Sequence, residues 1–282
     1  MYPAERDRSV DYRVLGDSLG GDVRGQMNSA GDLRSTLQSR GLDVVYQPII
    51  NLHTGKIAGM EALARWTTPS GAAVSPDVFI PMAEESGLIG ELGSQILTMA
   101  VRDAASWQSI APVTVRINVS AQEVRSRTFY DDAMRTIDKV GLDAALLGLE
   151  LPESTLQDQD EDTQDTLRQL HAAGVSLMLD DRGGGYTSLS CLESLPVADK
   201  LKIDRSLMTD DDPEGVAVVA SVIALGRSFG LSVCAEGVEN AIQHARVFGQ
   251  GCDFTQGYYF ARPTSRELVP QMLAAWATFL PV

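Results

Sequence analysis

Residues 175–181, with the sequence VSLMLDD, carry the pattern from which the fold is predicted. A short apolar run that ends in acidic residues is typical of a buried strand whose last residues reach a polar edge. The same pattern recurs along most of the chain, and it predicts strands at residues 44–50, 57–66, 113–119, 146–151, 175–179, 201–203, 231–235 and 252–255.

Helical patterns occur before, between and after these strands, at residues 32–39, 93–107, 128–140, 161–173, 188–195, 215–229, 239–248 and 265–279. Eight predicted strands, six of them alternating with helices over roughly 240 residues, match the size and rhythm of a (β/α)8 TIM barrel. A doubly wound sheet shares this alternation, but the glycine fingerprint expected after its first strand is missing. We therefore predict an α/β fold with one barrel domain at residues 31–282. Residues 1–30 are polar and glycine-rich, which predicts a flexible N-terminal tail.

The composition limits the classes of partner. The 282 residues contain 23 Lys and Arg against 38 Asp and Glu, which gives a net charge of −15. This charge repels phosphate backbones and anionic lipid, so we expect no nucleic-acid polymer and no membrane insertion. The first residues lack the apolar core of a signal peptide, and the three cysteines lack CxxC pairing. Both observations favour a cytoplasmic protein.

Polar side chains stand where the predicted strands end. Because the carboxyl ends of barrel strands meet at one rim, where barrel enzymes place their chemistry, these residues are candidate site residues. They are Glu61, Asn118, Glu150, Asp180, Asp181, Lys202, Asp204, Glu236 and Gln256. Carboxylates gathered at one rim cannot all ionise unaided, so we expect hard divalent cations with oxygen ligands among them.

The two-residue period of a strand sharpens this prediction. Glu61 and Arg65 share a face, so a carboxylate that binds metal and a guanidinium that binds phosphate can point the same way. Lys202 and Asp204 share a face likewise. The adjacent Asp180 and Asp181 must diverge, so that one enters the barrel while the other serves a second ion. Two ions, an amide and a lysine fit in-line displacement at phosphorus.

Other chemistries are poorly supplied by the sequence. His53, His171 and His244 share no strand-end position with a cysteine or serine, which argues against a nucleophilic triad. A GxxxxGK[ST] loop is missing, which excludes a P-loop nucleotidase. A glycosidase on the same barrel also uses paired carboxylates and is the enzymatic alternative. The chain has only three tryptophans, however, and so offers few aromatic side chains on which a sugar could stack.

A set of ordered motifs resembles a known family. The motifs are Tyr46-Gln47-Pro48-Ile49, Glu61-Ala62-Leu63-Ala64-Arg65-Trp66, Asn118-Val119-Ser120, Glu150 to Glu153, Asp180-Asp181, Leu201-Lys202-Ile203-Asp204-Arg205-Ser206, Ala235-Glu236-Gly237-Val238-Glu239 and Gln256-Gly257-Tyr258. From Asp32 to Met272, they closely resemble the EAL domain of cyclic di-GMP phosphodiesterases. An ordered set of this length is far more specific than the three-letter string EAL.

The resemblance implies a modified (β/α)8 barrel with its first strand antiparallel. Such domains hydrolyse the bacterial second messenger cyclic di-GMP to linear pGpG with Mg²⁺ or Mn²⁺ at a two-metal site, and a homodimer is implied as well. The resemblance assigns one metal to Glu61, Asn118, Glu150 and Asp180, and the second to Asp180 and Asp181. It assigns catalysis to Lys202, Glu236 and Glu61, substrate contacts to Arg65, Gln47, Asp204 and Gln256, and the anchoring of a loop to Glu153.

Three departures from the family pattern bear on activity. Arg182 and three glycines follow Asp181, where the family has an aromatic residue, and Pro152 stands where a threonine is usual. The segment before Lys202 is one residue longer than usual, and a slip of one residue would turn this side chain out of the barrel. We expect a bulge to absorb it. The sequence around Arg182 supports an alternative to an active enzyme: a catalytically weak or inactive EAL domain that acts as a cyclic di-GMP receptor or protein-binding regulator.

Overall fold

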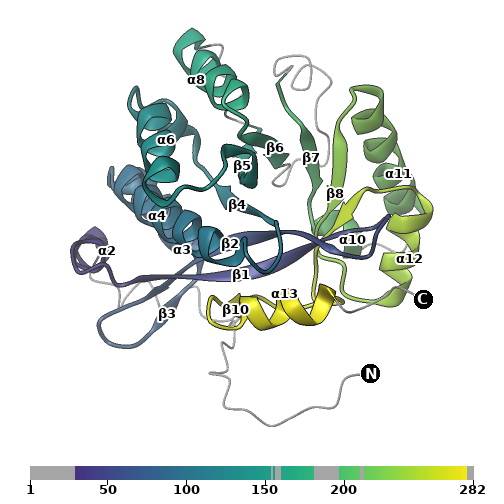
Figure 1. The fold of residues 1–282 in the computed structure, drawn as a ribbon, viewed down its shortest axis with the longest axis horizontal. Coiled ribbons are helices and arrows are strands. Elements are labelled where there is room, and N and C mark those ends of the chain that lie inside the picture. Colours follow the sequence, from purple (N-terminus) through teal and green to yellow (C-terminus); the bar gives the residue numbers. More distant parts are fainter. Residues whose placement is uncertain (1–28, 154, 156–159, 181–196, 210–212, 278–282) are drawn as a thin grey trace.

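The computed structural model describes residues 29–153, 155, 160–180, 197–209 and 213–277 (Figure 1). All eight predicted strands fall within these ranges. The predicted tail at residues 1–30 lies almost wholly outside them, and so do Asp181, Arg182 and the predicted helix at 188–195.

The strands close into an eight-stranded barrel, as predicted. The first strand, β1, runs antiparallel to its two barrel neighbours, β2 and β9, while the remaining barrel neighbours are parallel. The short strands β3 (Ala73–Val74) and β10 (Thr264–Ser265) pair with β2 and β1 outside the barrel. The barrel strands are β1 (Leu42–Asn51), β2 (Ile57–Thr67), β4 (Thr114–Asn118), β5 (Leu147–Pro152), β6 (Ser176–Asp180), β7 (Lys200–Ile203), β8 (Ser232–Ala235) and β9 (Phe254–Thr255).

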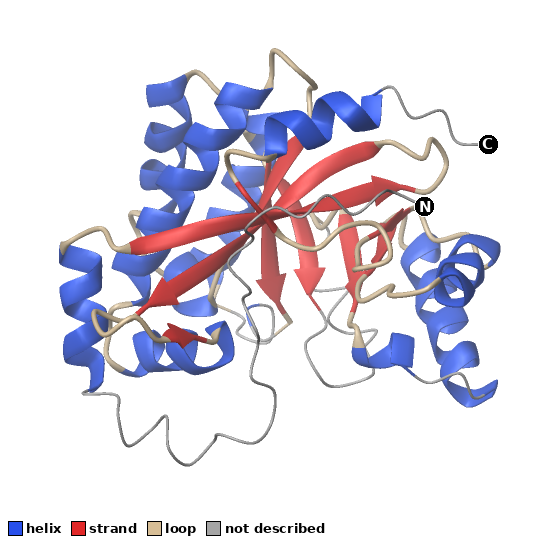
Figure 2. Ribbon diagram, turned by 90° about the horizontal axis from the view of Figure 1, so that it is seen from below, coloured by secondary structure: helices blue, strands red, loops and turns tan. Residues whose placement is uncertain are grey.

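Helices cover the outside of the strands, as Figure 2 shows in blue around red. Those expected from the sequence are α2 (Ser29–Gln38), α4 (Ile89–Trp107), α6 (Phe129–Val140), α8 (Glu161–Ala172), α11 (Pro213–Ser228), α12 (Ala241–Gly249) and α13 (Val269–Ala277). The structure adds α3 (Pro76–Glu85), α5 (Ala121–Val124), α10 (Ser206–Thr209) and a 3₁₀ turn at Ala144–Leu146. Helix α3 begins with Ser75 and Pro76, a start signal that the apolar pattern alone did not reveal.

Alternation along β1 shows how the sequence divides the inside of the barrel from the outside. Tyr46 points outward, where its hydroxyl donates to Asp103 Oδ2 of α4 at 2.7 Å and its ring packs edge-on against Trp107. The next residue, Gln47, therefore points into the barrel. Most large buried side chains lie on the outward faces of the strands and under the helices, whereas the interior holds polar residues together with a small apolar cluster of Ile49, Met178 and Cys234.

The loop after β4 is fixed by a capping box at the start of α5. The Ser120 hydroxyl accepts from the Glu123 backbone N–H, and the Glu123 carboxylate accepts from the Ser120 backbone N–H at 2.9 Å. The Glu123 carboxylate is buried against Gly93 of α4, where a Cβ atom would lie only 1.6 Å from its Oε1. Because this loop follows Asn118 directly, the contact also fixes the end of β4.

Replacing Gly93 by alanine is expected to destabilise the protein by about 1–3 kcal/mol, because the new methyl group overlaps the Glu123 carboxylate. Gly90, on the same helix, is the matched control. A Cβ atom there meets nothing within 4 Å, so Gly90→Ala should stabilise the helix by about 0.5–1 kcal/mol. Urea denaturation of both variants measures the difference, and equal effects would refute the overlap.

Burial of Glu123 predicts a pH-dependent stability. Burial raises the pKa of its carboxyl from 4.5 to about 7, against the hydrogen bonds from Ser120 that lower it. The folded protein therefore binds the proton more tightly, and the contribution to stability is lost as pH rises between these two values. The free energy of unfolding of the wild type, relative to Glu123→Gln, should fall by on the order of 2 kcal/mol from about pH 5 to pH 8. Parallel urea-denaturation results for the two proteins across this range would contradict the prediction.

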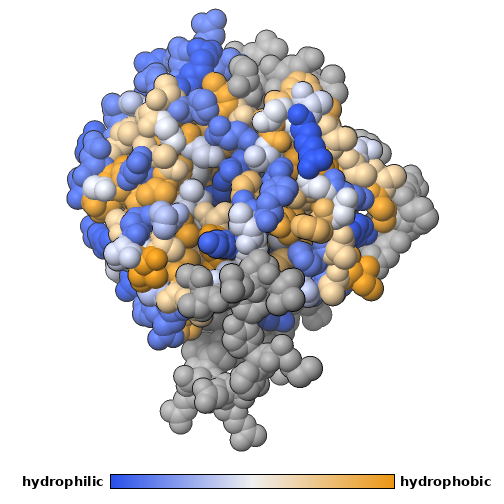
Figure 3. Space-filling model, turned by 45° about the vertical axis from the view of Figure 1, so that its right-hand side comes forward, coloured by the Kyte–Doolittle hydropathy of each residue, from blue (hydrophilic) through white to orange (hydrophobic). Residues whose placement is uncertain are grey.

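On the face in Figure 3, hydrophobic side chains (orange) occur in separate groups among hydrophilic ones (blue). Within the described ranges, the helices are all too short or too polar to cross a membrane.

Candidate active site

The structure gathers most of the predicted polar residues inside one end of the barrel. Strand pairing sets them level with each other, since Gln47 lies opposite Glu61, Asn118 opposite Glu150, and Asp180 opposite Lys202. Glu236 and Gln256 follow directly after β8 and β9. Neighbours in register on parallel or antiparallel strands share a face, so these side chains meet in the interior.

Lys202 lies at the centre of this group. Its ammonium Nζ is 2.7 Å from Glu150 Oε2, 3.3 Å from Glu61 Oε1 and 3.4 Å from Glu236 Oε2. The side chains of Lys202 and Glu150 are almost completely buried, whereas 30% of the Glu236 side chain is exposed. One buried positive charge is thus shared by three carboxylates, and the group retains negative charge that a further cation can balance.

Both carboxylate oxygens of Glu61 accept hydrogen bonds. Oε1 accepts from Asn118 Nδ2 at 2.8 Å, and Oε2 accepts from Gln256 Nε2 at 2.5 Å. The same Gln256 amide donates to Gln47 Oε1 at 3.0 Å, and Gln47 in turn donates to the backbone oxygen of Ala261. These buried amides hold Glu61 in one orientation, and this network links β1, β2, β4 and the loop after β9.

The loop after β9 is held close to the loop after β8. A Cβ atom on Gly257 would lie 2.0 Å from the backbone oxygen of Val238, so only glycine permits this approach. Val238 donates its backbone N–H to Gln256, and Tyr259 donates to Val238. The two loops therefore fix Glu236 and Gln256 relative to each other.

The electrostatics of the group follow from burial and from the shared lysine. Burial alone would raise the pKa of Glu61, but the Lys202 charge and the amide hydrogen bonds lower it below its ordinary value. Burial and then the Glu61 charge raise the pKa of Glu150 to about 7. Burial also raises the pKa of Glu236, against the pull of Lys202. The three carboxylates hold the pKa of Lys202 well above its ordinary value despite burial, so this ammonium stays charged.

The donor chemistry of the group fits a hard divalent cation. Its ligand atoms are carboxylate and amide oxygens, and Glu150 Oε1 is buried without a hydrogen-bond partner among the described residues. The described residues, which omit Asp181, contain no group of three or more His, Cys, Asp or Glu side chains that are arranged to hold a metal ion. Lys202 stands between the carboxylates instead.

The remaining predicted residues lie around the central group. Arg65 is on the face of β2 that carries Glu61, four residues further along, and its Nη1 donates to the backbone oxygen of Ala64. Asp204 follows β7 and accepts from the backbone N–H of Ser206 at 2.8 Å, so it caps the start of α10. Glu153 follows the end of β5 and is partly exposed. Their contacts with substrate stay predictions.

The expectation that Lys202 faces the barrel interior is confirmed by its contacts with Glu61 and Glu150. Asp199 fixes the register of the longer segment that precedes Lys202. Its backbone N–H donates to Leu177 at 2.9 Å, and its backbone oxygen accepts from Ser232 at 3.0 Å. Asp199 Oδ2 also accepts from the Leu177 backbone N–H. These bonds join the segment to both neighbouring strands before β7 begins.

One further charged residue, Arg116, was not among the predicted site residues; it lies two residues before Asn118 on the same face of β4 and is buried in the barrel. The two-residue period that paired Glu61 with Arg65 also places Arg116 inside, so the signal was present.

Comparison with known proteins finds a matching family model and related individual proteins. The family model described as EAL domain matches residues 30–263. The protein y4lL of Sinorhizobium fredii is 40% identical over 244 residues, which cover 86% of this chain and 29% of that protein. The bifunctional diguanylate cyclase/cyclic di-GMP phosphodiesterase MucR of Pseudomonas aeruginosa is 34% identical over 281 residues, covering 98% of this chain and 40% of that protein.

A solved structure of similar fold is described as the PaMucR phosphodiesterase in complex with c-di-GMP. It matches with a TM-score of 0.79 and 34% identity, and the match covers 85% of this chain and 98% of that one. The present chain spans less than half the length of these two relatives: the matched residues make up 29% of y4lL and 40% of MucR.

Proposed function

Because this chain belongs to the EAL domain family, we propose that it hydrolyses cyclic di-GMP to linear pGpG with the help of Mg²⁺ or Mn²⁺. The observation that carries the proposal is the buried ammonium of Lys202, held between Glu61, Glu150 and Glu236 at one end of the barrel. The similarity to a phosphodiesterase structure that contains c-di-GMP supports the choice of substrate.

The residues proposed to hold the metal ions are Glu61, Asn118, Glu150 and Asp180, with Asp181 completing a second position. Bound divalent ions supply a Lewis acid that lowers the pKa of water and neutralises charge on the phosphodiester. Glu61 is the best oriented of these residues to bind a metal ion, because three donors fix its carboxylate and keep it ionised.

Lys202 acts as a fixed positive charge rather than as a base. Its pKa is raised well above the ordinary value, so it keeps its proton at neutral pH. A preorganised ammonium in a buried site stabilises the negative charge that develops on the phosphoryl oxygens as water attacks and one P–O bond breaks. Its contacts with three carboxylates hold it in place throughout.

Glu236 is proposed to accept the proton from the attacking water. It is the exposed member of the three carboxylates around Lys202, so the proton can pass on to solvent. Burial raises the pKa of Glu236, which makes its carboxylate a stronger base than an exposed glutamate. Arg65 lies beyond Glu61 on the same strand face, and there its guanidinium can bind a phosphate of the substrate.

Incubation with cyclic di-GMP tests the proposal directly. The purified protein is given Mg²⁺ or Mn²⁺, with a chelator as control, and the nucleotides are separated by chromatography. Metal-dependent pGpG is the expected product. Cyclic di-GMP that stays intact with both metals contradicts the enzymatic proposal.

A cyclic di-GMP receptor without turnover is the second candidate, and the sequence Arg182-Gly183-Gly184-Gly185 favours it. A charged residue cannot pack as an aromatic anchor would, and glycine loses more conformational entropy on ordering than any other residue. Substituting phenylalanine for Arg182 separates the two. An inactive receptor should gain turnover, by about tenfold or more over background, whereas an active enzyme should change little. Chromatography measures turnover, and calorimetry measures binding of the intact dinucleotide.

A further inference from the structure

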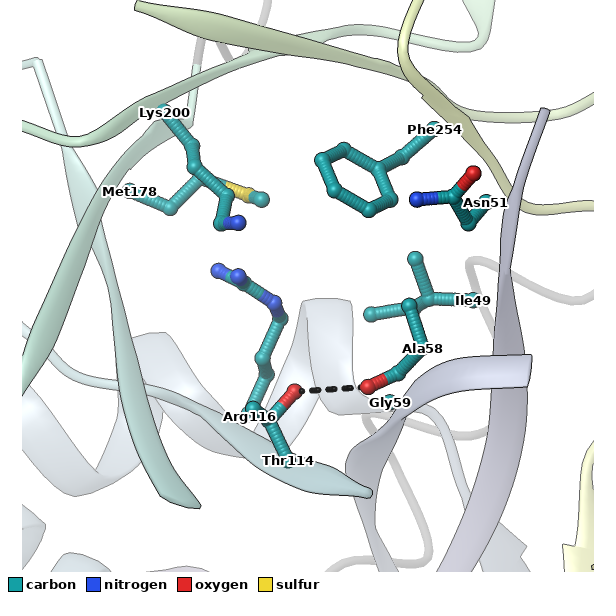
Figure 4. A pocket seen from close by; sticks show the side chains of 9 residues that line it. All are labelled: Ile49, Asn51, Ala58, Gly59, Thr114, Arg116, Met178, Lys200 and Phe254. Atoms are coloured by element: carbon teal, nitrogen blue, oxygen red, sulfur yellow. Dashed lines mark hydrogen bonds between the residues drawn. The ribbon is translucent and has the colours of Figure 1, made fainter. Parts of the chain in front are cut away.

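A cavity of about 270 Å³ lies at the opposite end of the barrel from the candidate active site (Figure 4). It is lined by residues from the first halves of the parallel strands β2, β4, β6, β7 and β9, and by the last residues of the antiparallel β1. None of the predicted site residues lines it. Most of its lining residues are apolar, but two of them, Arg116 and Lys200, are cationic.

Arg116 is the most deeply buried of these polar groups. Its side chain leaves β4 and points into the cavity (Figure 4). The residue is only 4% exposed, and its Nη1 has no hydrogen-bond partner among the described residues. Gly148 on β5 makes room for it, since a Cβ atom there would lie 3.1 Å from Arg116 Cγ. The barrel thus accommodates a buried guanidinium while leaving one of its donors unused.

Lys200, at the start of β7, faces the same space. Its ammonium lies 4.4 Å from the centre of the Phe254 ring, and in the described part of the chain it pairs with no carboxylate. Burial, and then the charge of Arg116, lower the pKa of Lys200. The nearby acids Asp199 and Asp253 accept hydrogen bonds from backbone N–H groups and face histidines.

Asn51 adds a third donor. Its Oδ1 accepts from the backbone N–H groups of His53 and Thr54, both at 2.9 Å, so the amide is held in one orientation. This orientation turns the Nδ2 group toward the cavity, as Figure 4 shows. A guanidinium, an ammonium and an amide therefore converge on one space that contains no carboxylate.

We propose that this cavity is a binding site for a small, doubly charged oxyanion such as phosphate, held by Arg116, Lys200 and Asn51. A buried cation without a counter-ion is costly, and a second, partly exposed cation that faces it adds to this cost. A dianion supplies the missing counter-charge and accepts hydrogen bonds from all three donors. The volume leaves room for a tetrahedral anion together with ordered water.

Thermal unfolding in the presence of inorganic phosphate tests the proposal, with a chelator present to exclude metal-bound phosphate. Phosphate should raise the melting temperature of the wild type more than sodium chloride does at the same ionic strength, because a ligand that binds only the folded state stabilises it. Isothermal titration calorimetry should detect one site. Sulfate, which has the same shape and charge, should act like phosphate.

Two variants locate the effect. Lys200→Gln removes a partly exposed cation at the mouth of the cavity, and it should weaken phosphate binding by about tenfold or more. Arg116→Gln should do the same where it folds. Lys139→Gln, an equal change of charge on exposed α6, should leave the phosphate effect intact. Equal phosphate effects in Lys200→Gln and the wild type, or an effect no larger than that of sodium chloride, would overturn the proposal.

Discussion

Replacing Glu61 by glutamine is expected to abolish metal-dependent hydrolysis of cyclic di-GMP, with a loss in turnover on the order of a thousandfold or more. Glu61 accepts hydrogen bonds from Asn118, Lys202 and Gln256, so all its neighbours present donors. Glutamine has almost the same shape but lacks the charge that a metal ion needs. Its NH₂ group must also face at least one of these donors, so one buried hydrogen bond is lost.

The loss of activity must be separated from a loss of folding. A donor facing a donor in a buried site costs about 1–3 kcal/mol, so Glu61→Gln should unfold at a lower temperature but still fold. Glu85→Gln, at an exposed glutamate of α3, is the matched control and should keep full activity. Chromatography of the nucleotides and thermal unfolding are measured on the same preparations. A folded Glu61→Gln protein that produces pGpG at the wild-type rate would contradict the proposed role.

The positions of Glu61, Glu150 and Lys202 could be predicted from the sequence because strands impose a two-residue period and barrels bring the ends of their strands together. An apolar run followed by a polar residue therefore specifies both the strand and the end at which the residue lies. The partners of each residue could not be predicted in the same way. That Gln256 binds Glu61, or that Lys202 is shared by three carboxylates, depends on which strands become neighbours after the barrel closes.

The features that escaped prediction depend on contacts between distant segments. Glu123 resembles an ordinary helix residue in the sequence, and only its contact with Gly93 on another helix shows that it is buried. Arg116 was missed for a different reason, because a charged residue in a strand is usually assigned to the solvent side. The interior of this barrel holds charged side chains at both ends, so burial in it does not require an apolar side chain.

Replacing Lys202 by methionine is expected to have the largest effect on stability. The variant leaves Glu61, Glu150 and Glu236 without their shared positive charge, and breaking a buried ion pair in this way costs about 3–5 kcal/mol. Turnover should also fall, by on the order of a hundredfold or more, because a fixed charge near the phosphoryl oxygens is lost. The same change at exposed Lys139 should alter neither property appreciably.

Divalent ions and pH should both modulate the Lys202→Met defect, because its cause is unbalanced negative charge. Mn²⁺ should raise the melting temperature of the variant more than that of the wild type, since the ion replaces the missing charge. Burial already raises the pKa of Glu150 to about 7 in the presence of the lysine, so without it the folded protein binds protons still more tightly. The stability of the variant should therefore fall relative to the wild type as pH rises from about 5 to 8. A Lys202→Met protein as stable as the wild type at neutral pH without divalent ions would show that the carboxylates are not held by this lysine, and the proposed electrostatic arrangement of the site would be wrong.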